Sequence, residues 1–237
     1  MQQNILITGN SSGLGYALTE AYLTQGSTIY GLSRRGCANL SSKLHDVHCD
    51  LSKHDQIALA LQVLLGNVEK LDVVYLNAGI FGELTHITDF KLEQLNRIID
   101  INVWANKFIL DWLLSNTIRI TQVIAISSGA ALSANKGWAG YSLSKIALNK
   151  LIEHYATEFT STHFISLAPG LIDTAMQDYL CDETLELGNE FPGLEKFRQA
   201  RGTETMPSPR RVAQSIIDIL PSLQKLPSGG FTDLINL

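Results

Sequence analysis

The chain has few cysteines and no long apolar run, and each shortage excludes a class of protein. Its three cysteines, Cys37, Cys49 and Cys181, are too few and too scattered for the disulfide framework of a secreted domain. No apolar stretch reaches the length that crosses a bilayer, and the first three residues lead directly into a predicted strand rather than a leader peptide. We therefore expect a cytoplasmic protein with no membrane partner.

Basic residues are also scarce, with 18 Lys and Arg against 23 Asp and Glu, and they form no blocks. The net charge of -5 argues against nucleic acid or an anionic membrane surface as a partner. No Pro/Ser/Gly-rich linker and no internal repeat divides the 237 residues, of which 45% are hydrophobic. A single domain spanning residues 1–237, with one substantial core, is the economical interpretation.

Metal-ligand spacing is missing as well. His45, His48, Cys49 and His54 stand close together, but His48 and Cys49 are adjacent and would point to opposite faces of a strand. A closed zinc site needs paired ligand spacing, so we expect no metal.

The sequence does contain apolar, strand-like runs that alternate with segments of helical periodicity. This alternation predicts an α/β fold, a doubly wound parallel sheet of the Rossmann type with helices on both faces in three α/β/α layers. The expected strands cover residues 4–8, 28–33, 47–49, 72–76, 122–127 and 163–168, with a possible last strand at 228–233. Residues 89–115 and 209–220 are expected to be helical, whereas 177–207 is polar and lacks strong periodicity, as in lids and binding loops.

A glycine-rich turn separates the first expected strand from the following helix. Gly9 permits a tight turn, Gly13 allows backbone to approach a pyrophosphate, and Gly15 allows the helix to pack on the strand. The GxxxGxG spacing differs from the simplest dinucleotide fingerprint, GxGxxG, and a purely structural turn is the alternative. The candidate cofactor-binding residues here are Gly9, Ser11, Ser12, Gly13, Leu14 and Gly15.

Tyr141 and Lys145 are four residues apart, and Tyr141 lies thirteen residues after Ser128. Positions i and i+4 share one face of a helix, so the Lys145 ammonium would lie against the phenol of Tyr141 and favour its anion. Ser128 could then hold a substrate oxygen while Tyr141 transfers the proton. The alternative is a surface helix that carries a Tyr and a Lys by chance.

These motifs occur in an order that resembles the short-chain dehydrogenase/reductase family along nearly the whole chain. The landmarks are residues 8–15, Asp50, Asn77-Ala78-Gly79, Asn102, Ser128, Tyr141 with Lys145, and Pro169-Gly170 followed by Asp173-Thr174.

The resemblance implies a role for each landmark. Asn102, Ser128, Tyr141 and Lys145 would form the catalytic tetrad, with Asn102 positioning a water that links Lys145 to solvent. The remaining cofactor contacts would be Asp50 and Leu51 near the adenine, Asn77, Ala78 and Gly79 along the cleft, Pro169 and Gly170, and Ile172 and Thr174 at the nicotinamide amide. Purely structural roles are the alternatives, because Asn77 and Asn102 can hydrogen-bond to backbone groups and Asp50 can cap a turn.

The end of the second expected strand should decide between the two nicotinamide cofactors. It holds no acid for a ribose 2'-hydroxyl, whereas Ser33 can donate a hydrogen bond and Arg34 offers a planar fork suited to phosphate. We expect NADP(H). The alternative is that Arg34 and Arg35 are solvated surface residues.

Within the family, residues 33–35, 137–141 and 228–233 resemble the sepiapterin reductase and benzil reductase branch. The resemblance implies NADPH-dependent reduction of a small carbonyl, a ketone or vicinal diketone, by hydride transfer, with Tyr141 as general acid. Substrate contacts are expected from Ser128, Tyr141 and Trp138, although Trp138 could equally be a packing residue. Asp233 could anchor a pterin ring or cap a turn, and residues 175–207 would cover the substrate.

Two other functions are kept open. A 3-oxoacyl thioester reductase would have to dock an acidic carrier, yet residues 173–204 hold eight acids against Lys196, Arg198 and Arg201. A non-catalytic NADP(H)-sensing protein would not need the full tetrad. By resemblance the long helix at 89–115 could pair across a homodimer or homotetramer interface, or its apolar residues could face only the sheet.

Overall fold

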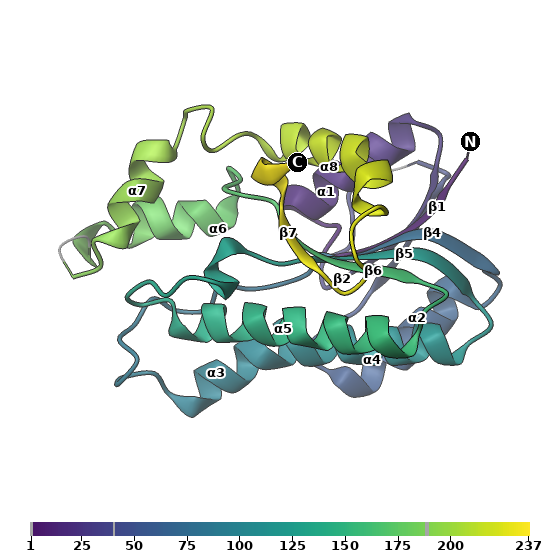
Figure 1. The fold of residues 1–237 in the computed structure, drawn as a ribbon, viewed down its shortest axis with the longest axis horizontal. Coiled ribbons are helices and arrows are strands. Elements are labelled where there is room, and N and C mark those ends of the chain that lie inside the picture. Colours follow the sequence, from purple (N-terminus) through teal and green to yellow (C-terminus); the bar gives the residue numbers. More distant parts are fainter. Residues whose placement is uncertain (1, 40, 188–189) are drawn as a thin grey trace.

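The structure, a computed structural model, describes residues 2–39, 41–187 and 190–237. Its centre is a parallel sheet of seven strands in the order β3-β2-β1-β4-β5-β6-β7 (Figure 1). The strands are β1 (Asn4–Thr8), β2 (Thr28–Ser33), β3 (Leu44–His48), β4 (Lys70–Leu76), β5 (Arg119–Ile126), β6 (His163–Ala168) and β7 (Phe231–Asp233). The expected doubly wound parallel fold is confirmed.

Burial on both faces explains why the strands read as continuous apolar runs. In β1, for example, Ile5, Leu6 and Ile7 are all fully buried, because helices cover both sides of a parallel sheet. Each expected strand is present, but several boundaries differ, and the last strand begins at Phe231 rather than at 228. The third lies at Leu44–His48 rather than 47–49, and β4 and β5 begin at Lys70 and Arg119, where exposed, charged first residues hide the strand signal.

Helices cover the two faces of the sheet. Figure 1 shows α1 (Gly13–Thr24) and α8 (Pro209–Leu223) on one face, and α2 (His54–Leu65), α4 (Ala105–Ser115) and α5 (Ala139–Glu158) on the other. Each layer has its own buried apolar cluster, one under α1 and α8 and one under α2, α4 and α5. These two cores hold the carboxyl ends of the strands in fixed relative positions.

The helical pattern at 89–115 consists of three consecutive elements. The helix α3 (Leu92–Ile99) continues through a π-helical stretch, Asp100–Trp104, into α4. A π-helical turn admits an extra residue and changes the direction of the side chains after it, and such turns are frequent at functional sites. Periodicity alone predicts the helix but not this insertion.

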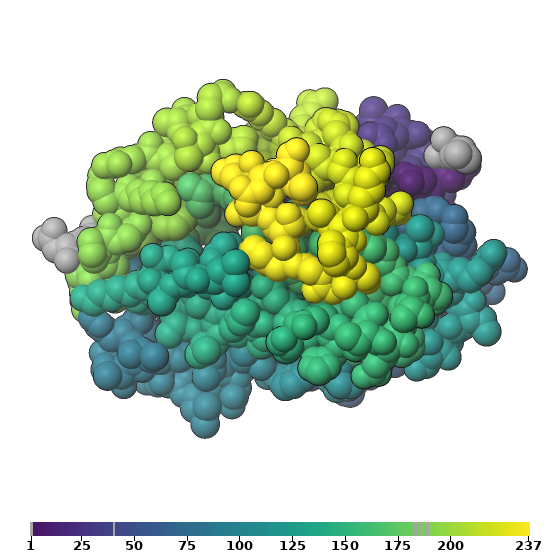
Figure 2. All heavy atoms as spheres, in the orientation of Figure 1, coloured from purple at the N-terminus to yellow at the C-terminus, as the bar shows by residue number. Residues whose placement is uncertain are grey.

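The expectation of an irregular segment at 177–207 is wrong for most of its length. Helical elements occupy much of its described part, namely α6 (Ala175–Asp178), the π-helical stretch Tyr179–Glu183, the short turn Leu185–Leu187 and α7 (Gly193–Ala200). Gly188 and Asn189 lie outside the described residues. The turns were hidden because each is too short to show a clear helical period in the sequence. Residues 175–207 are called the lid segment below, and in Figure 2 the lid segment overhangs the teal chain that precedes α5.

No helix within the described part of the chain is both long enough and apolar enough to span a bilayer.

Candidate active site

The predicted site residues lie at the carboxyl ends of the strands, in the connections that follow them and on the helical segments next to those connections. β1 and β4 are neighbours in the sheet but are separated in the sequence, so a topological switch point falls between their ends. Thr8 and Asn77 join these two ends, since the Thr8 hydroxyl accepts hydrogen bonds from the Asn77 and Ala78 amides, both at 3.0 Å. The Asn77 side-chain amide donates to the Thr8 carbonyl at 2.9 Å. The backbone-satisfying role of Asn77 is therefore present.

The glycine turn can be made only by glycines. Gly9 and Gly13 have positive φ values of 69° and 55°. A Cβ on Gly15 would lie 2.3 Å from the Gly9 carbonyl oxygen, which no side chain could tolerate. Gly13 begins α1, and Ser12 at its N-cap makes no side-chain capping bond. The backbone amides at the start of this twelve-residue helix form a cradle suited to a pyrophosphate.

Two further positions fit a dinucleotide bound along this edge. The Ser33 hydroxyl is buried without a hydrogen-bond partner at the end of β2, as a group that awaits a ligand would be. Thr174 approaches the glycine turn from β6, because its Cγ2 would be 3.4 Å from a Cβ on Gly13. Pro169 and Gly170 lie on the same connection after β6, where Pro169 is partly buried and Gly170 is exposed. The apolar side chains of Leu14, Leu51 and Ile172 are buried in the two cores, so any contact from them would be through backbone.

The catalytic candidates surround Gly79. A Cβ on this residue would lie 3.2 Å from Asn102 Oδ1 and 3.5 Å from Lys145 Nζ. Lys145 is only 4% exposed, and its Nζ donates to the Ile126 carbonyl at 2.7 Å. The structure thus brings Asn102 and Lys145, which are 43 positions apart, to the same small space above β4 and β5.

Asn102 lies on the π-helical stretch, and its side chain is fully engaged. Its Oδ1 accepts from the Ile80 amide at 2.8 Å, while its Nδ2 donates to the Ile80 carbonyl and to the Ser144 hydroxyl, both at 2.9 Å. Asn102 therefore has the structural role of hydrogen bonding to backbone groups, and the water that it was expected to position stays a prediction. Ser144 was not singled out from the sequence, although it directly precedes Lys145.

Tyr141 lies beside Ser128, but its ionisation differs from the expectation. Burial raises the pKa of Tyr141 to about 12, and the hydrogen bond with Ser128 lowers it only in part. Lys145 Nζ lies 5.6 Å from the centre of the Tyr141 ring, and burial lowers the pKa of Lys145 to about 8. The pKa of Tyr141 is thus raised rather than lowered, because desolvation of the phenol dominates, and the stabilisation of its anion by Lys145 stays a prediction.

At the end of β2, the arginine that reaches the glycine turn is not the one predicted. Arg35 Nη2 donates to the Ser12 hydroxyl at 3.1 Å, so Arg35 reaches the glycine turn. Arg34 is exposed and faces Asp50, whose pKa is lowered chiefly by the Ser52 hydroxyl hydrogen bond and further by Arg34. Asp50 also accepts from the Ser52 amide at 3.1 Å, so its turn-capping role is present.

Sequence reasoning missed a partly buried polar pair between the glycine turn and β3. The Asn10 side-chain amide donates to Asp46 Oδ1 at 2.7 Å, and Asn10 Oδ1 has no partner. Asp46 Oδ2 in turn accepts from the Cys37 amide at 2.9 Å. A polar residue inside a glycine turn is the only signal in the sequence.

Trp138 has the packing role that was left open. It is 7% exposed, stacks on Phe197 at 4.9 Å and meets Phe81 edge-on at 4.8 Å, while the Tyr141 ring lies 6.1 Å away. Phe81, which was not predicted, lies closer to Tyr141, at 5.1 Å. Asp233 Oδ1 accepts from the Ile235 amide at 3.1 Å, as a turn cap does.

The candidate metal ligands have other contacts. His45 stacks on Tyr30 at 5.3 Å, and the His54 ring hydrogen-bonds to the Asp100 carbonyl at 2.9 Å. Within residues 2–39, 41–187 and 190–237, no group of three His, Cys, Asp or Glu side chains is arranged to hold a metal ion.

The fold and this edge define an α/β protein with a dinucleotide-type glycine turn and a Ser-Tyr-Lys group. Residues 3–184 match the family model for short chain dehydrogenase, so the chain belongs to that family. It is 27% identical to a benzil reductase ((S)-benzoin forming) of Bacillus cereus, over 95% of this chain and 96% of that protein. It is 32% identical to a 3-oxoacyl-acyl-carrier-protein reductase of Rickettsia bellii, over 78% of each chain.

The fold also matches solved structures. An NADPH-bound structure of an ElxO variant superposes with a TM-score of 0.78 at 20% identity, covering 99% of this chain and 97% of that one.

Proposed function

We propose that the protein is an NADPH-dependent reductase of a small carbonyl compound, with Tyr141 as the general acid. The observation that carries this proposal is the arrangement of Ser128, Tyr141 and the buried Lys145 at the carboxyl edge of the sheet, next to Gly79. A phenol with a pKa of about 12 is protonated at neutral pH, so it is ready to donate.

The chain's residues divide the work as follows. Ser128 holds the carbonyl oxygen by a hydrogen bond, and Tyr141 donates its proton to that oxygen as the carbonyl becomes an alcohol. The Lys145 ammonium then lies near the phenolate that remains and stabilises it in a site sheltered from water. Bound reduced nicotinamide would supply the hydride that reaches the carbonyl carbon.

Three observations support NADPH over NADH. The end of β2 carries no acid, and two arginines, Arg34 and Arg35, follow it. Arg35 already lies against the glycine turn, where it could form charge-assisted hydrogen bonds to a phosphate. The structurally similar ElxO variant was solved with NADPH.

A vicinal diketone or related small ketone is the proposed substrate class. The likeness to benzil reductases along nearly the whole chain supports it. The likeness to a 3-oxoacyl-acyl-carrier-protein reductase keeps thioester reduction as the second candidate. The lid segment disfavours an acidic carrier, because its arginines are already used internally. Arg201 pairs with Asp178 and Asp182, and Arg198 donates to backbone carbonyls.

The test is an NADPH-oxidation screen over aromatic and aliphatic vicinal diketones, sepiapterin and a 3-oxoacyl thioester. We expect turnover of a diketone, and Tyr141→Phe should lower kcat by at least about a hundredfold while leaving NADPH affinity nearly intact. NADPH binding without turnover of any of these compounds would favour the sensor. Preference for the thioester would replace the diketone assignment, and a Tyr141→Phe enzyme with most of its activity would remove Tyr141 from the acid's role.

We also propose that two or four copies associate in the cytoplasm. Large apolar side chains are exposed on the outer side of the layer that contains α4 and α5, where a second copy could cover them. They are Trp104 and Phe108 around the start of α4, and Leu143 and Ile146 on α5. Light scattering of the purified protein tests this, with Phe108→Glu expected to shift the mass toward the monomer.

A further inference from the structure

Aromatic rings connect the lid segment to Tyr141. The Phe81 ring centre lies 5.1 Å from that of Tyr141 and 6.2 Å from that of Tyr179, which belongs to the lid segment. Tyr179 is partly exposed, whereas Phe81 is 5% exposed. The lid segment therefore presents an aromatic surface one ring away from the phenol that would donate the proton.

Local structure turns Tyr179 toward this position. Tyr179 begins the π-helical stretch Tyr179–Glu183, which follows α6 directly. Its hydroxyl accepts a hydrogen bond from the Leu84 amide at 3.2 Å, across 95 positions of the chain. A widened helical turn and a long-range hydrogen bond together fix the ring beside Phe81 rather than in solvent.

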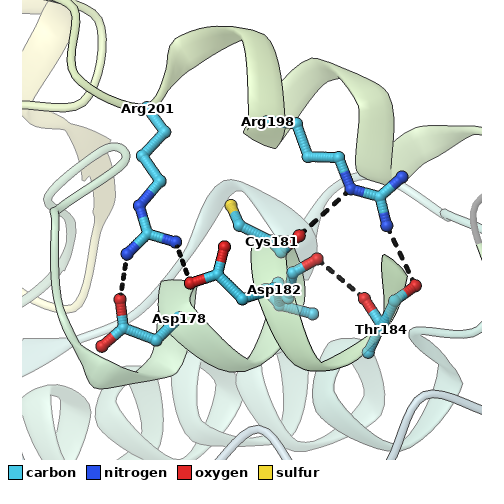
Figure 3. Close-up of polar contacts among 7 residues, drawn as sticks. Asp178, Cys181, Asp182, Thr184, Arg198 and Arg201 are labelled. Atoms are coloured by element: carbon cyan, nitrogen blue, oxygen red, sulfur yellow. Dashed lines mark hydrogen bonds and ion pairs between the residues drawn. The ribbon is translucent and has the colours of Figure 1, made fainter. Parts of the chain in front are cut away.

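Arg198 of α7 and Arg201, which follows it, hold the π-helical stretch Tyr179–Glu183 in place (Figure 3). Arg201 follows the last residue of α7 and forms ion pairs with Asp178, which directly precedes Tyr179, and with Asp182 in the π-helical stretch. Arg198 donates to the Cys181 carbonyl at 3.2 Å and to the Thr184 carbonyl at 2.9 Å. The guanidinium groups thus bind both ends of the π-helical stretch, and α7 fixes the orientation of Tyr179.

The surroundings of Tyr141 on this side are mostly apolar, although Lys136 Nζ lies 5.6 Å from the centre of the Phe191 ring. A third buried cluster, separate from the two cores under the sheet, is formed here by the lid segment and the connections after β4 and β5. Its members are Phe81, Leu84, Ala130, Trp138, Leu180, Phe191 and Leu194, with Tyr141, Met176, Tyr179, Leu187 and Phe197 packed against them. Such a surface favours flat apolar groups over charged ones.

We propose that Tyr179 and Phe81 form an aromatic subsite that receives an aryl group attached to the reacting carbonyl. Tyr179 is a specificity-determining residue, and Arg201 is a positioning residue that acts through it. This inference rests on the proposed carbonyl reduction, and it adds which side of the substrate is recognised and by which ring.

The test compares two diketones that differ in one substituent, 1-phenyl-1,2-propanedione and 2,3-butanedione. Tyr179→Ala should lower kcat/KM for the phenyl compound by about tenfold and change that for butanedione less than about twofold. Tyr179→Phe keeps the ring and should retain the phenyl preference within about threefold. Equal losses for both diketones in Tyr179→Ala would overturn the subsite.

Arg201→Gln tests the positioning role. It should raise KM for the phenyl compound several-fold, leave kcat and the NADPH dissociation constant unchanged, and leave butanedione unaffected. Arg211→Gln is the matched control, because Arg211 forms a surface ion pair with Glu204 outside this cluster. A KM for the phenyl compound that is the same in both variants would remove Arg201 from the positioning role.

Binding without turnover separates this inference from the proposed function. Calorimetry on the Tyr141→Phe protein loaded with NADP⁺ should show that the phenyl compound binds about tenfold more tightly than butanedione, and that adding Tyr179→Ala abolishes the difference. If the native chain reduced no carbonyl, this difference would still be expected and only the reductase assignment would fall. Equal binding of the two diketones would overturn the subsite whatever the turnover.

Discussion

Replacing Lys145 with Met should stabilise the folded protein while abolishing its activity. Burial lowers the pKa of Lys145 from 10.5 to about 8, so near neutral pH the folded chain holds a charge in a site that disfavours it. At about 1.4 kcal/mol per pKa unit, this amounts to roughly 3 kcal/mol of lost stability relative to a solvated lysine. Methionine has a similar length and carries no charge.

A hydrogen bond offsets part of that gain. Lys145 Nζ donates to the Ile126 carbonyl at 2.7 Å, and methionine leaves this buried acceptor at the end of β5 without that donor. The loss costs about 1 to 2 kcal/mol, so the net stabilisation by Lys145→Met should be about 1 to 2 kcal/mol near neutral pH.

The pH dependence has a definite sign. Between about 8 and 10.5, the unfolded chain still binds the Lys145 proton that the folded chain has released. Stability of the native sequence therefore rises with pH through this window, relative to the methionine variant. Because the neutral amine can still donate to the Ile126 carbonyl, the advantage of Lys145→Met should vanish within this window and reverse by about pH 10.

Urea unfolding of both proteins, near pH 7 and near pH 10, measures these differences. Lys150→Met is the matched control, because Lys150 lies on the same helix with its side chain 62% exposed and should change stability by less than about 0.5 kcal/mol. A Lys145→Met protein that is less stable than the native one at pH 7, or a difference that is independent of pH, would refute the reasoning.

The remaining predictions concern pH, cofactor and packing. The kcat/KM for reduction should fall as pH rises through about 8, because Lys145 loses its charge there, and a profile that is flat across that pH would contradict the role of the ammonium. NADPH should be preferred over NADH by about tenfold to a hundredfold, less at high salt. Michaelis constants for both cofactors should show that Arg35→Ala loses most of this preference, that Arg34→Ala loses less, and that Ser33→Asp reverses it. If the ratio of the two Michaelis constants were unchanged in both arginine variants, the assignment of NADP(H) would be wrong. Trp138→Ala should lower the free energy of unfolding by about 3 to 5 kcal/mol, because the indole is buried among aromatic rings. A loss below about 1 kcal/mol in urea unfolding would contradict the packing role of Trp138.

Local patterns were sufficient for the architecture, and together with the family resemblance they named the catalytic candidates. Continuous apolar runs predict buried parallel strands, because both faces of such a sheet are covered, and the glycines at 9, 13 and 15 predict the turn, because no other residue allows its backbone. The spacing of Tyr141 and Lys145 places them on one helical face whatever surrounds the helix. These features depend on neighbours in the chain and are therefore readable in the sequence.

Tertiary packing decided what distant residues do to one another. Desolvation raises the Tyr141 pKa although Lys145 lies nearby, and this depends on how deeply the lid segment and Phe81 bury the phenol. Arg35 reaches Ser12 across 23 positions of the chain, a contact that depends on how the turn after β2 lies against the glycine turn. The π-helical turn that directs Tyr179 adds a residue to a helix and leaves no periodic signal. Each outcome depends on contacts between segments remote in sequence, which only the folded chain brings together.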